Sequence, residues 1–320
     1  MQEMVEQYAL MVLVREKLQA HGIISSAQEV SLQPIHSFLF QGRQKTHFII
    51  RTTSPVQIFF LKAVKDADGA LFCDEFLRKM YRGKENCPFP LILVPKFKAQ
   101  GMEYYITTFL AGVNLDHLSA EMTVINWEQL ADKLLSRLHE MASIHAPQYS
   151  ERDGFFSGSC GTALIRKLQA RVRHPLLSCF PQEQVKIAVS KYSDVLTHSS
   201  YSLPTLLHMD IKPANIIYNP QTKDISVVDF EFARFGDMDY GWIQILLSGI
   251  NLFSPMYQHV FVPRLTRDYL PLSEAVNIPK LRAYSFYQCL CNLIYYYDHH
   301  LPYPEKISDP LLSIPYMERR

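Results

Sequence analysis

Two short segments in the second half of the chain limit its possible folds more than any other feature. Residues 208–217 read HMDIKPANII, and residues 227–231 read VVDFE. The apolar residues around each polar cluster predict two short strands, joined by a turn at Asn219-Pro220. A hairpin of this kind would bring Asp229, at its end, back beside Asn215.

The polar residues of this hairpin suit phosphoryl transfer. That chemistry needs a carboxylate that orients the attacking hydroxyl and accepts its proton, and oxygen ligands close by that hold Mg²⁺ on nucleotide phosphates. Asp210 and Asn215 can supply the carboxylate and one ligand from a single loop, and Asp229 can supply a second ligand. Two unrelated surface loops are the alternative explanation, and the order and spacing of the full pattern argue against it.

The pattern H-x-D-x-x-x-x-N, followed by a strand and D-F-E, resembles the protein-kinase superfamily. Residues 229–242, DFEFARFGDMDYGW, are similar to the same segment of the aminoglycoside phosphotransferase and choline kinase families. Protein kinases carry D-F-G and A-P-E instead, whereas this chain has Glu231 at the Gly position and no Ala-Pro-Glu. The resemblance implies an α+β, two-lobed protein-kinase-like fold. A small β-rich N-terminal lobe would span residues 1–110, and a larger, mainly helical lobe residues 111–320.

The first third of the chain fits the smaller lobe, and Lys62 is its most informative residue. A lysine inside an apolar strand needs a partner for its ammonium group, or a place in solvent on an edge strand. In the resembling families this lysine contacts the α- and β-phosphates and pairs with a helix glutamate. Glu75 is the best candidate for that partner, and Asp74 is its competitor. A full G-x-G-x-x-G is absent, and only Gly42 is present, so phosphate contacts by residues 40–45 stay open. Hydrophobic periodicity predicts helices at 3–21 and 70–81, and strands at 29–40, 46–52, 56–64, 91–94 and 103–108.

Residues 109–115, FLAGVNL, resemble the hinge of these phosphotransferases. The resemblance implies that the Thr108 carbonyl and the Leu110 amide meet the adenine edge of ATP, with GTP as an alternative. It also assigns Ile217 and Val228, on the two hairpin strands, to the nucleotide site.

The resemblance gives each polar residue of the motif a role. Asp210 would be the catalytic carboxylate, and Asn215 and Asp229 would hold two Mg²⁺ ions. Glu231 would ligate metal through water or position the acceptor. Lys212 departs from many antibiotic kinases, because Asp-x-Lys-Pro-x-Asn is the wording of serine/threonine protein kinases. It would add positive charge at the transferred group, and it keeps an atypical protein kinase open as an alternative.

Two residues of these segments are expected to have structural roles instead of catalytic ones. His208 would brace the loop that carries Asp210, and the resemblance implies that Asp239 hydrogen-bonds to this loop. A loop is expected at 154–161, and helices at 127–144, 163–173, 182–197, 240–252 and 278–298. The basic face of the 163–173 helix is expected to be solvated, with an anionic partner as the alternative. The aromatic residues of the last helix are expected in the core, with a cationic ligand as the alternative.

Composition narrows the partners. The formal charge of +1, with 48% apolar and 20% charged residues, favours neither nucleic acid nor a membrane surface. No signal peptide and no membrane-spanning run is recognised. The six cysteines form no CxxC pair, which favours reduced thiols and a cytoplasmic location.

The acceptor is expected to be a hydroxyl of a small molecule, of the antibiotic type or the choline and amino-alcohol type. Acidic and basic residues are nearly balanced in the last eighty residues, which does not support a strongly polycationic acceptor. A nucleotide-binding pseudokinase is the non-enzymatic alternative, although every expected catalytic position is filled. The oligomeric state is not predicted.

Overall fold

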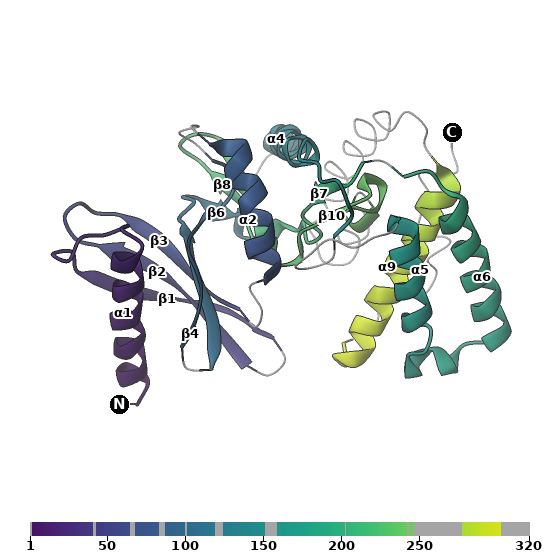
Figure 1. Ribbon diagram of the computed structural model, residues 1–320, viewed down its shortest axis with the longest axis horizontal. Helices are drawn as coiled ribbons and strands as arrows, with labels where there is room; N and C mark the ends of the chain where they lie inside the picture. Colours follow the sequence, from purple (N-terminus) through teal and green to yellow (C-terminus); the bar gives the residue numbers. More distant parts are fainter. Residues whose placement is uncertain are drawn as a thin grey trace.

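The computed structural model has an antiparallel sheet at the N-terminal end and a mostly helical region at the C-terminal end (Figure 1). It describes residues 2–40, 43–64, 68–82, 87–99, 101–118, 124–150, 159–201, 203–241, 243–245 and 277–301. The predicted α+β class, with a β-rich N-terminal part and a helical C-terminal part, is confirmed. A lobe boundary at residue 110 stays a prediction.

The N-terminal sheet has the order β1-β2-β3-β5-β4, and all neighbouring strands are antiparallel. Helix α1 (Gln2–Ala20) packs on this sheet through Leu10, Val14 and Leu18, which are buried and four residues apart. Helix α2 (Asp68–Tyr81) joins β3 to β4. The strands are β1 (Val30–Phe40), β2 (Arg43–Thr52), β3 (Ile58–Val64), β4 (Ile92–Ala99) and β5 (Met102–Thr108).

The predicted helices and strands of this region are therefore confirmed, with shifts of a few residues at their ends. Gln41 and Gly42 lie outside the described residues, so phosphate contacts by residues 40–45 stay a prediction.

Two small sheets carry the motif residues. Strand β7 pairs with β10, and β6, β8 and β9 form a three-stranded sheet in the order β6-β8-β9. The predicted hairpin is confirmed as the antiparallel pair β8 and β9. The strands are β6 (Val113–Asn114), β7 (Thr205–Leu207), β8 (Ile216–Asn219), β9 (Asp224–Val227) and β10 (Arg234–Gly236).

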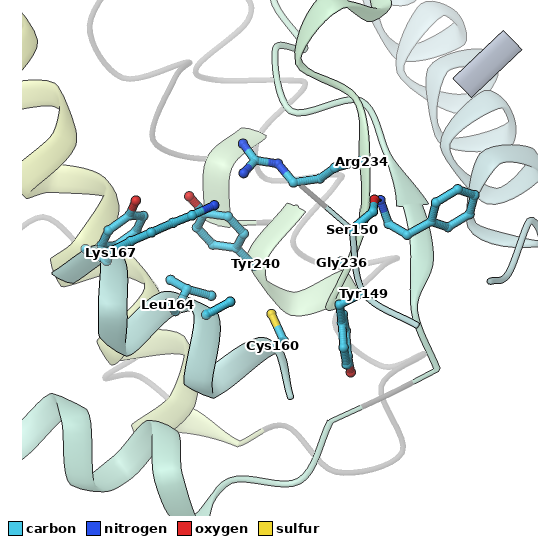
Figure 2. A pocket seen from close by; sticks show the side chains of 11 residues that line it. Tyr149, Ser150, Cys160, Leu164, Lys167, Arg234, Gly236 and Tyr240 are labelled. Carbon is cyan, nitrogen blue, oxygen red and sulfur yellow. The ribbon is translucent and has the colours of Figure 1, made fainter. Parts of the chain in front are cut away.

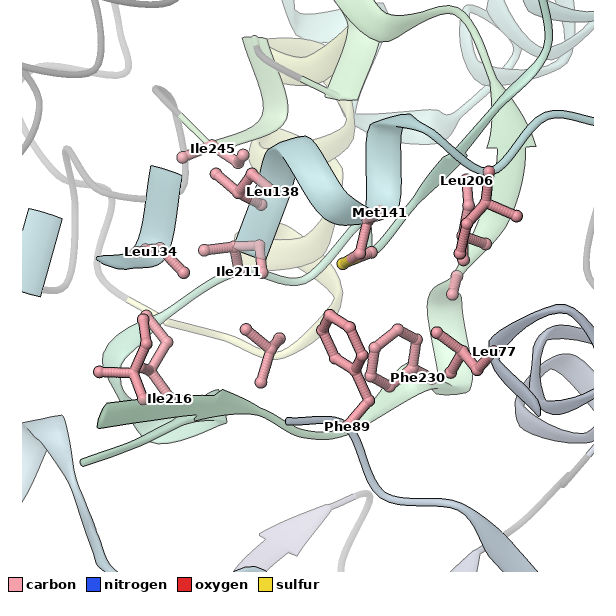
Figure 3. Packing of buried hydrophobic residues seen from close by; sticks show 14 of the residues in the cluster. Leu77, Phe89, Leu134, Leu138, Met141, Leu206, Ile211, Ile216, Phe230 and Ile245 are labelled. Carbon is pink, nitrogen blue, oxygen red and sulfur yellow. The ribbon is translucent and has the colours of Figure 1, made fainter. Parts of the chain in front are cut away.

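Helix α4 (Val124–Ala142) covers these small sheets and shares a core with α2 and the motif. Figure 3 shows Leu134, Leu138 and Met141 of α4 across this core from Ile216 and Phe230. Phe230 is the central residue of Asp-Phe-Glu and is 4% exposed. Its burial fixes the backbone on both sides, so the two flanking carboxylates are held in place.

Helices α5 (Cys160–Arg171), α6 (Gln182–His198) and α9 (Ile278–Asp298) build a second core at the C-terminal end (Figure 1). The expectation that the aromatic residues of α9 belong to the core holds for Tyr284 and Tyr287, which are buried. Tyr295 and Tyr297, near the end of the helix, are exposed.

Two predictions in this region need correction or fall partly outside the structure. The loop expected at 154–161 is wrong for Cys160 and Gly161, which are helical because the Ser159 hydroxyl caps α5 at the Thr162 amide. Residues 151–158 are outside the described part. The helix expected at 240–252 is present at residues 238–241 and 243–245, and the remainder is also outside. No helix in the described ranges is long and apolar enough to cross a membrane.

Candidate active site

The predicted catalytic loop, residues 208–215, follows β7 and ends in a 3₁₀ turn at Pro213–Asn215. The Asn215 side-chain nitrogen donates to the Asp210 carbonyl and to Asp210 Oδ2, both at 2.9 Å. Asn114 of β6 fixes the backbone of this 3₁₀ turn, because its side-chain amide donates to the Ala214 carbonyl at 2.6 Å. The backbone at Met209 has a φ of 66°, which is unusual for a residue with a side chain. The loop is thus fixed by side-chain to backbone bonds on both sides of Asp210.

His208 braces this loop, in agreement with its expected role. Its Nε2 lies 2.8 Å from the Val228 carbonyl, and its Nδ1 accepts the Asp210 amide at 3.3 Å. A carbonyl can only accept, so the proton must be on Nε2. Burial lowers the pKa of His208 to about 4, and the ring is therefore neutral at pH 7. A neutral ring can make both bonds, whereas a protonated ring could not accept at Nδ1.

The hairpin brings Asp229 back to the loop, as predicted. The Val228 amide donates to the Asn215 carbonyl at 2.9 Å. Asp229 itself has a left-handed backbone with a φ of 72° and begins the 3₁₀ turn Phe230–Phe232. Aspartate tolerates this conformation better than most residues, and strained backbone of this kind often occurs at functional sites.

Lys62 crosses from the N-terminal sheet to this turn. Its Nζ lies 2.5 Å from Asp229 Oδ1 and 3.1 Å from Glu231 Oε1. Burial alone would lower the pKa of Lys62, but the Asp229 carboxylate outweighs it and raises the pKa above its usual value. Burial alone would likewise raise the pKa of Asp229, but Lys62 holds it below its usual range. Both groups are charged at neutral pH. Their ion pair connects β3 of the N-terminal sheet to the turn that carries Asp229.

The prediction that Glu75 pairs with Lys62 is wrong in this structure. Glu75 is exposed on α2 and pairs with Lys79, one turn along the helix, at 2.7 Å. Asp74 is not the partner of Lys62 either, because its carboxylate accepts the Ile92 amide and pairs with Arg78. The reason is helix phase: the buried face of α2 includes residues 70, 73, 74, 77 and 81, and position 75 lies away from it.

Lys212 lies beside Asp210, the predicted catalytic carboxylate. Its Nζ is 2.8 Å from Asp210 Oδ2. Burial raises the pKa of Asp210, and the nearby Lys212 ammonium opposes this shift. The structure therefore brings Asp210, Lys212, Asn215, Asp229 and Glu231 into one connected group with Lys62.

The residues expected to bind the nucleotide lie at the end of β5, on the segment that follows it, and on the hairpin of β8 and β9. Thr108 ends β5, and its carbonyl accepts the Thr107 hydroxyl at 3.1 Å, which leaves one lone pair for a ligand. Leu110 follows and is half-buried. Strand β6 then pairs with β8 and places Asn114 opposite Ile217. Val228 is half-buried and connects β9 to Asp229.

Gly112 allows the segment before β6 to lie against β8. No role of its own was predicted for this residue from the sequence. Its φ is 148°, and a Cβ at this position would lie 2.4 Å from the Tyr218 carbonyl oxygen. Only glycine permits such a close approach of two backbones. The glycine in the hinge sequence was the available signal.

A family model described as the phosphotransferase enzyme family matches residues 45–281, which include every motif residue discussed above. The chain belongs to this family. No curated protein matches the chain.

Solved structures similar to this phosphotransferase include antibiotic kinases. Aminoglycoside phosphotransferase APH(4)-Ia has a TM-score of 0.62 and 17% identity, with 91% of this chain and 93% of that chain covered. A GDP complex of aminoglycoside 2'-phosphotransferase-IIIa has a TM-score of 0.58 and 15% identity, with 96% and 97% covered. A putative fructosamine-3-kinase from Haemophilus somnus 129PT has a TM-score of 0.56 and 14% identity, with 98% of both chains covered. At these identities the likeness shows a shared kinase-like fold.

The donor chemistry of this phosphotransferase fits Mg²⁺. Asp229 is ionised, and Glu231 lies on the same short turn. Asn215 uses its amide nitrogen on Asp210, so its amide oxygen is the group that remains for a cation. Among the described residues, no group of three or more His, Cys, Asp or Glu side chains could hold a metal by itself. Mg²⁺ usually takes one or two carboxylates from the protein and completes its coordination with phosphates and water.

A buried ion-pair cluster behind the motif was not predicted. Lys280 of α9 lies 2.6 Å from Asp239 and 3.2 Å from Asp237, which is completely buried. The expected bond from Asp239 to the catalytic loop is therefore replaced by an ion pair to α9. The sequence separates Lys280 from these acids by about forty residues, so no local pattern could reveal the cluster.

Proposed function

We propose that this phosphotransferase moves the γ-phosphoryl group of a nucleoside triphosphate to a hydroxyl of a small molecule. The observation that carries the proposal is the connected group of Lys62, Asp229, Asn215, Asp210 and Lys212, with its ion pairs and hydrogen bonds. Lys62 and Lys212 supply cations that can bind phosphate. Asp229 and Asn215 supply oxygen ligands that can bind a metal, and Asp210 supplies a carboxylate that can accept a hydroxyl proton. These are the parts that phosphoryl transfer requires.

In the proposed reaction, Asp210 accepts a hydrogen bond from the acceptor hydroxyl and aligns its oxygen with the γ-phosphorus. The new oxygen–phosphorus bond forms as the bond between the γ-phosphorus and the bridging oxygen breaks. The hydroxyl proton passes to Asp210, whose buried position raises its pKa and makes it a better base. Lys212, beside Asp210, offsets negative charge on the transferred group.

Lys62, which pairs with Asp229 and Glu231, would hold the α- and β-phosphates. Mg²⁺ bound to Asp229 and Asn215 would supply charge neutralisation on the phosphates. Glu231 would hold the Lys62 ammonium in position and bind the metal through water, and it would not itself take part in proton or phosphoryl transfer. ATP is the proposed donor, bound through the Thr108 carbonyl and the Leu110 amide, with GTP as the alternative.

A small-molecule acceptor is favoured over a protein acceptor by the segment after the motif. Only residues 232–237 separate Glu231 from the helix that begins at Met238, and residues 234–236 form strand β10. A protein substrate needs a longer platform at this position.

The decisive experiment measures nucleoside diphosphate release with Mg²⁺ and ATP or GTP. The acceptors are aminoglycosides, choline, ethanolamine, small sugars and a generic protein. Asp210→Asn removes the base, and Asp194→Asn, at an exposed position on α6, is the matched control. We expect release stimulated by a small molecule, lost in Asp210→Asn and kept in the control. Label transferred to protein, or release unaffected by Asp210→Asn, would refute the proposal.

A further inference from the structure

A small pocket lies in the helical region, between α5, β10 and α9 (Figure 2). Its volume is about 30 Å³, and it is partly open to solvent. One water molecule needs roughly 10–15 Å³ on the same measure. The pocket therefore suits the head group of a ligand rather than a whole ligand. Its lining includes Cys160, Lys167, Arg234, Tyr240 and Tyr287.

Arg234 is the unusual residue of this pocket. Its Nε is buried and has no hydrogen-bond partner in the part of the chain that the structure describes. No carboxylate in the described ranges forms an ion pair with Arg234. A buried guanidinium nitrogen without an acceptor is costly, and guanidinium groups usually bind carboxylates or phosphates through two parallel bonds. Figure 2 shows its guanidinium group extending into the pocket, toward the side where Tyr240 lies.

Other cations lie around the same pocket. Lys167 of α5 lines it directly (Figure 2). Burial raises the pKa of the Cys291 thiol, and the positive charges of Arg171, Arg234 and Lys167 oppose this shift. Lys167 and Arg234 both line the pocket, and Arg171 lies one turn after Lys167 on α5. The other lining side chains are mostly apolar or aromatic, so water screens these charges less than it would on an open surface.

The pocket is within reach of the catalytic group. Arg234 pairs across the small sheet with Leu207, which precedes Asp210 by three residues. A fully extended chain spans at most about 3.6 Å per residue, so the Cα atoms of Leu207 and Asp210 are at most about 11 Å apart. The same limit applies to Arg234 and Glu231, which are also three residues apart. The cross-strand pair adds at most about 5.5 Å, so the Cα atoms of Arg234 and Asp210 are at most about 16 Å apart. The two side chains and a small acceptor molecule can bridge this distance together.

We propose that the pocket binds an anionic group, a carboxylate or a phosphate, of the acceptor whose hydroxyl is phosphorylated. This inference rests on the proposed function and narrows its acceptor to hydroxy acids or phosphorylated polyols and sugars. Arg234 binds the anion through its planar fork, and Lys167 adds a point charge. If the pocket binds this anion, Lys167 on the basic face of α5 contacts a ligand.

The first test measures binding without turnover. Inorganic phosphate and malonate are titrated by calorimetry into the full chain, with AMP-PNP and Mg²⁺ present so that the nucleotide phosphate positions are filled. We expect at least one anion to bind, and Arg234→Gln to weaken it about 10- to 100-fold, the usual effect of losing a charge-assisted hydrogen bond. Arg173→Gln, at an exposed position just after α5, is the matched control and should not change the affinity.

The second test compares acceptors that differ only in the anionic group. Diphosphate release is measured with gluconate against glucose, and with glycerol 3-phosphate against glycerol. We expect Arg234→Gln to lower kcat/KM about 10- to 100-fold for the anionic member of the pair that is used, and to leave the neutral member within about two-fold. Preference for gluconate assigns a carboxylate, and preference for glycerol 3-phosphate assigns a phosphate.

The proposal is overturned if neither anion binds, or if Arg234→Gln and Arg173→Gln bind alike. If Arg234→Gln does not fold, as judged by circular dichroism, Lys167→Gln on α5 decides by the same comparison. Failure of the proposed function can be told apart from failure of this proposal. If the proposed function is wrong, Asp210→Asn leaves diphosphate release unchanged. The anion titrations do not depend on turnover, so they still measure binding to the pocket. If no acceptor is turned over, the titrations alone decide.

Discussion

Replacing Lys62 by methionine is the sharpest test of the site's electrostatics. Methionine keeps an unbranched apolar side chain of similar length and removes the ammonium group. The change leaves Asp229 and Glu231, which now share that ammonium at 2.5 and 3.1 Å, without a cation between them. Removal of one partner of a buried ion pair typically costs about 3–5 kcal/mol.

The expected cost lies at the lower end of that range. The side chains of Asp229 and Glu231 retain 29% and 17% exposure, so water partly solvates the charges left behind. We therefore expect a loss of about 3 kcal/mol. The unfolding entropy is about 2.1 cal/mol/K per residue, which gives about 0.67 kcal/mol/K for a chain of 320 residues. The melting temperature should thus fall by about 4 °C.

The assay is differential scanning calorimetry without nucleotide. Lys79→Met removes an exposed lysine paired with Glu75 and is the matched control, with an expected change below about 0.5 kcal/mol. Adding Asp229→Asn to Lys62→Met should restore part of the stability, because one of the two unpaired charges is removed. Mg²⁺ should raise the melting temperature of Lys62→Met more than that of the wild type. If Lys62→Met melts like Lys79→Met, and the double variant is less stable than either single variant, the electrostatic reasoning is refuted.

Three further outcomes are expected. His208 has a pKa of about 4 in the folded state against about 6.5 when unfolded, so only the unfolded chain gains this proton as the pH falls below 6.5. The free energy of unfolding should therefore fall by about 2 kcal/mol between pH 7.5 and 5. In denaturant titrations, His208→Gln should reduce this dependence of stability on pH. The same pH dependence in the wild type and in His208→Gln would contradict the assignment of a neutral ring. Gly112→Ala should cost at least about 2 kcal/mol, because its Cβ would meet the Tyr218 carbonyl; Gly101→Ala, with open space around it, should cost less, and the reverse order would be inconsistent with the close approach. Lys280→Met should cost about 3–5 kcal/mol by leaving two acids unpaired, and a loss below 1 kcal/mol in the same titrations would contradict it.

Most of the fold was predictable because its signals are local. Periodicity within one helix or strand predicts α1, α2, α9 and the strands of the N-terminal sheet. The return of Asp229 to Asn215 was also predictable, since a tight hairpin has few possible geometries. Strands β7 and β10 were missed, because three residues are too few to show an alternating pattern.

The site was less predictable where partners are distant in sequence. The motif contains Asp229 and Glu231, but no local pattern shows that both carboxylates pair with Lys62, far away in the sequence. The family pattern favoured Glu75 instead, and the phase of α2 directs that residue to solvent. Lys280 was missed for the same reason, because its acids belong to another segment.

The contact between Lys62 and Asp229 joins residues that are 167 positions apart. Translation delivers the chain from its N-terminus, so Lys62 leaves the ribosome long before the carboxylates that hold it. The ion pair can form only after the segment that carries Asp229 and Glu231 has been made. A chain that stops before residue 229 lacks both carboxylates, so its Lys62 is left without these two partners. The N-terminal sheet thus contains a buried lysine whose partners are supplied by the other half of the chain.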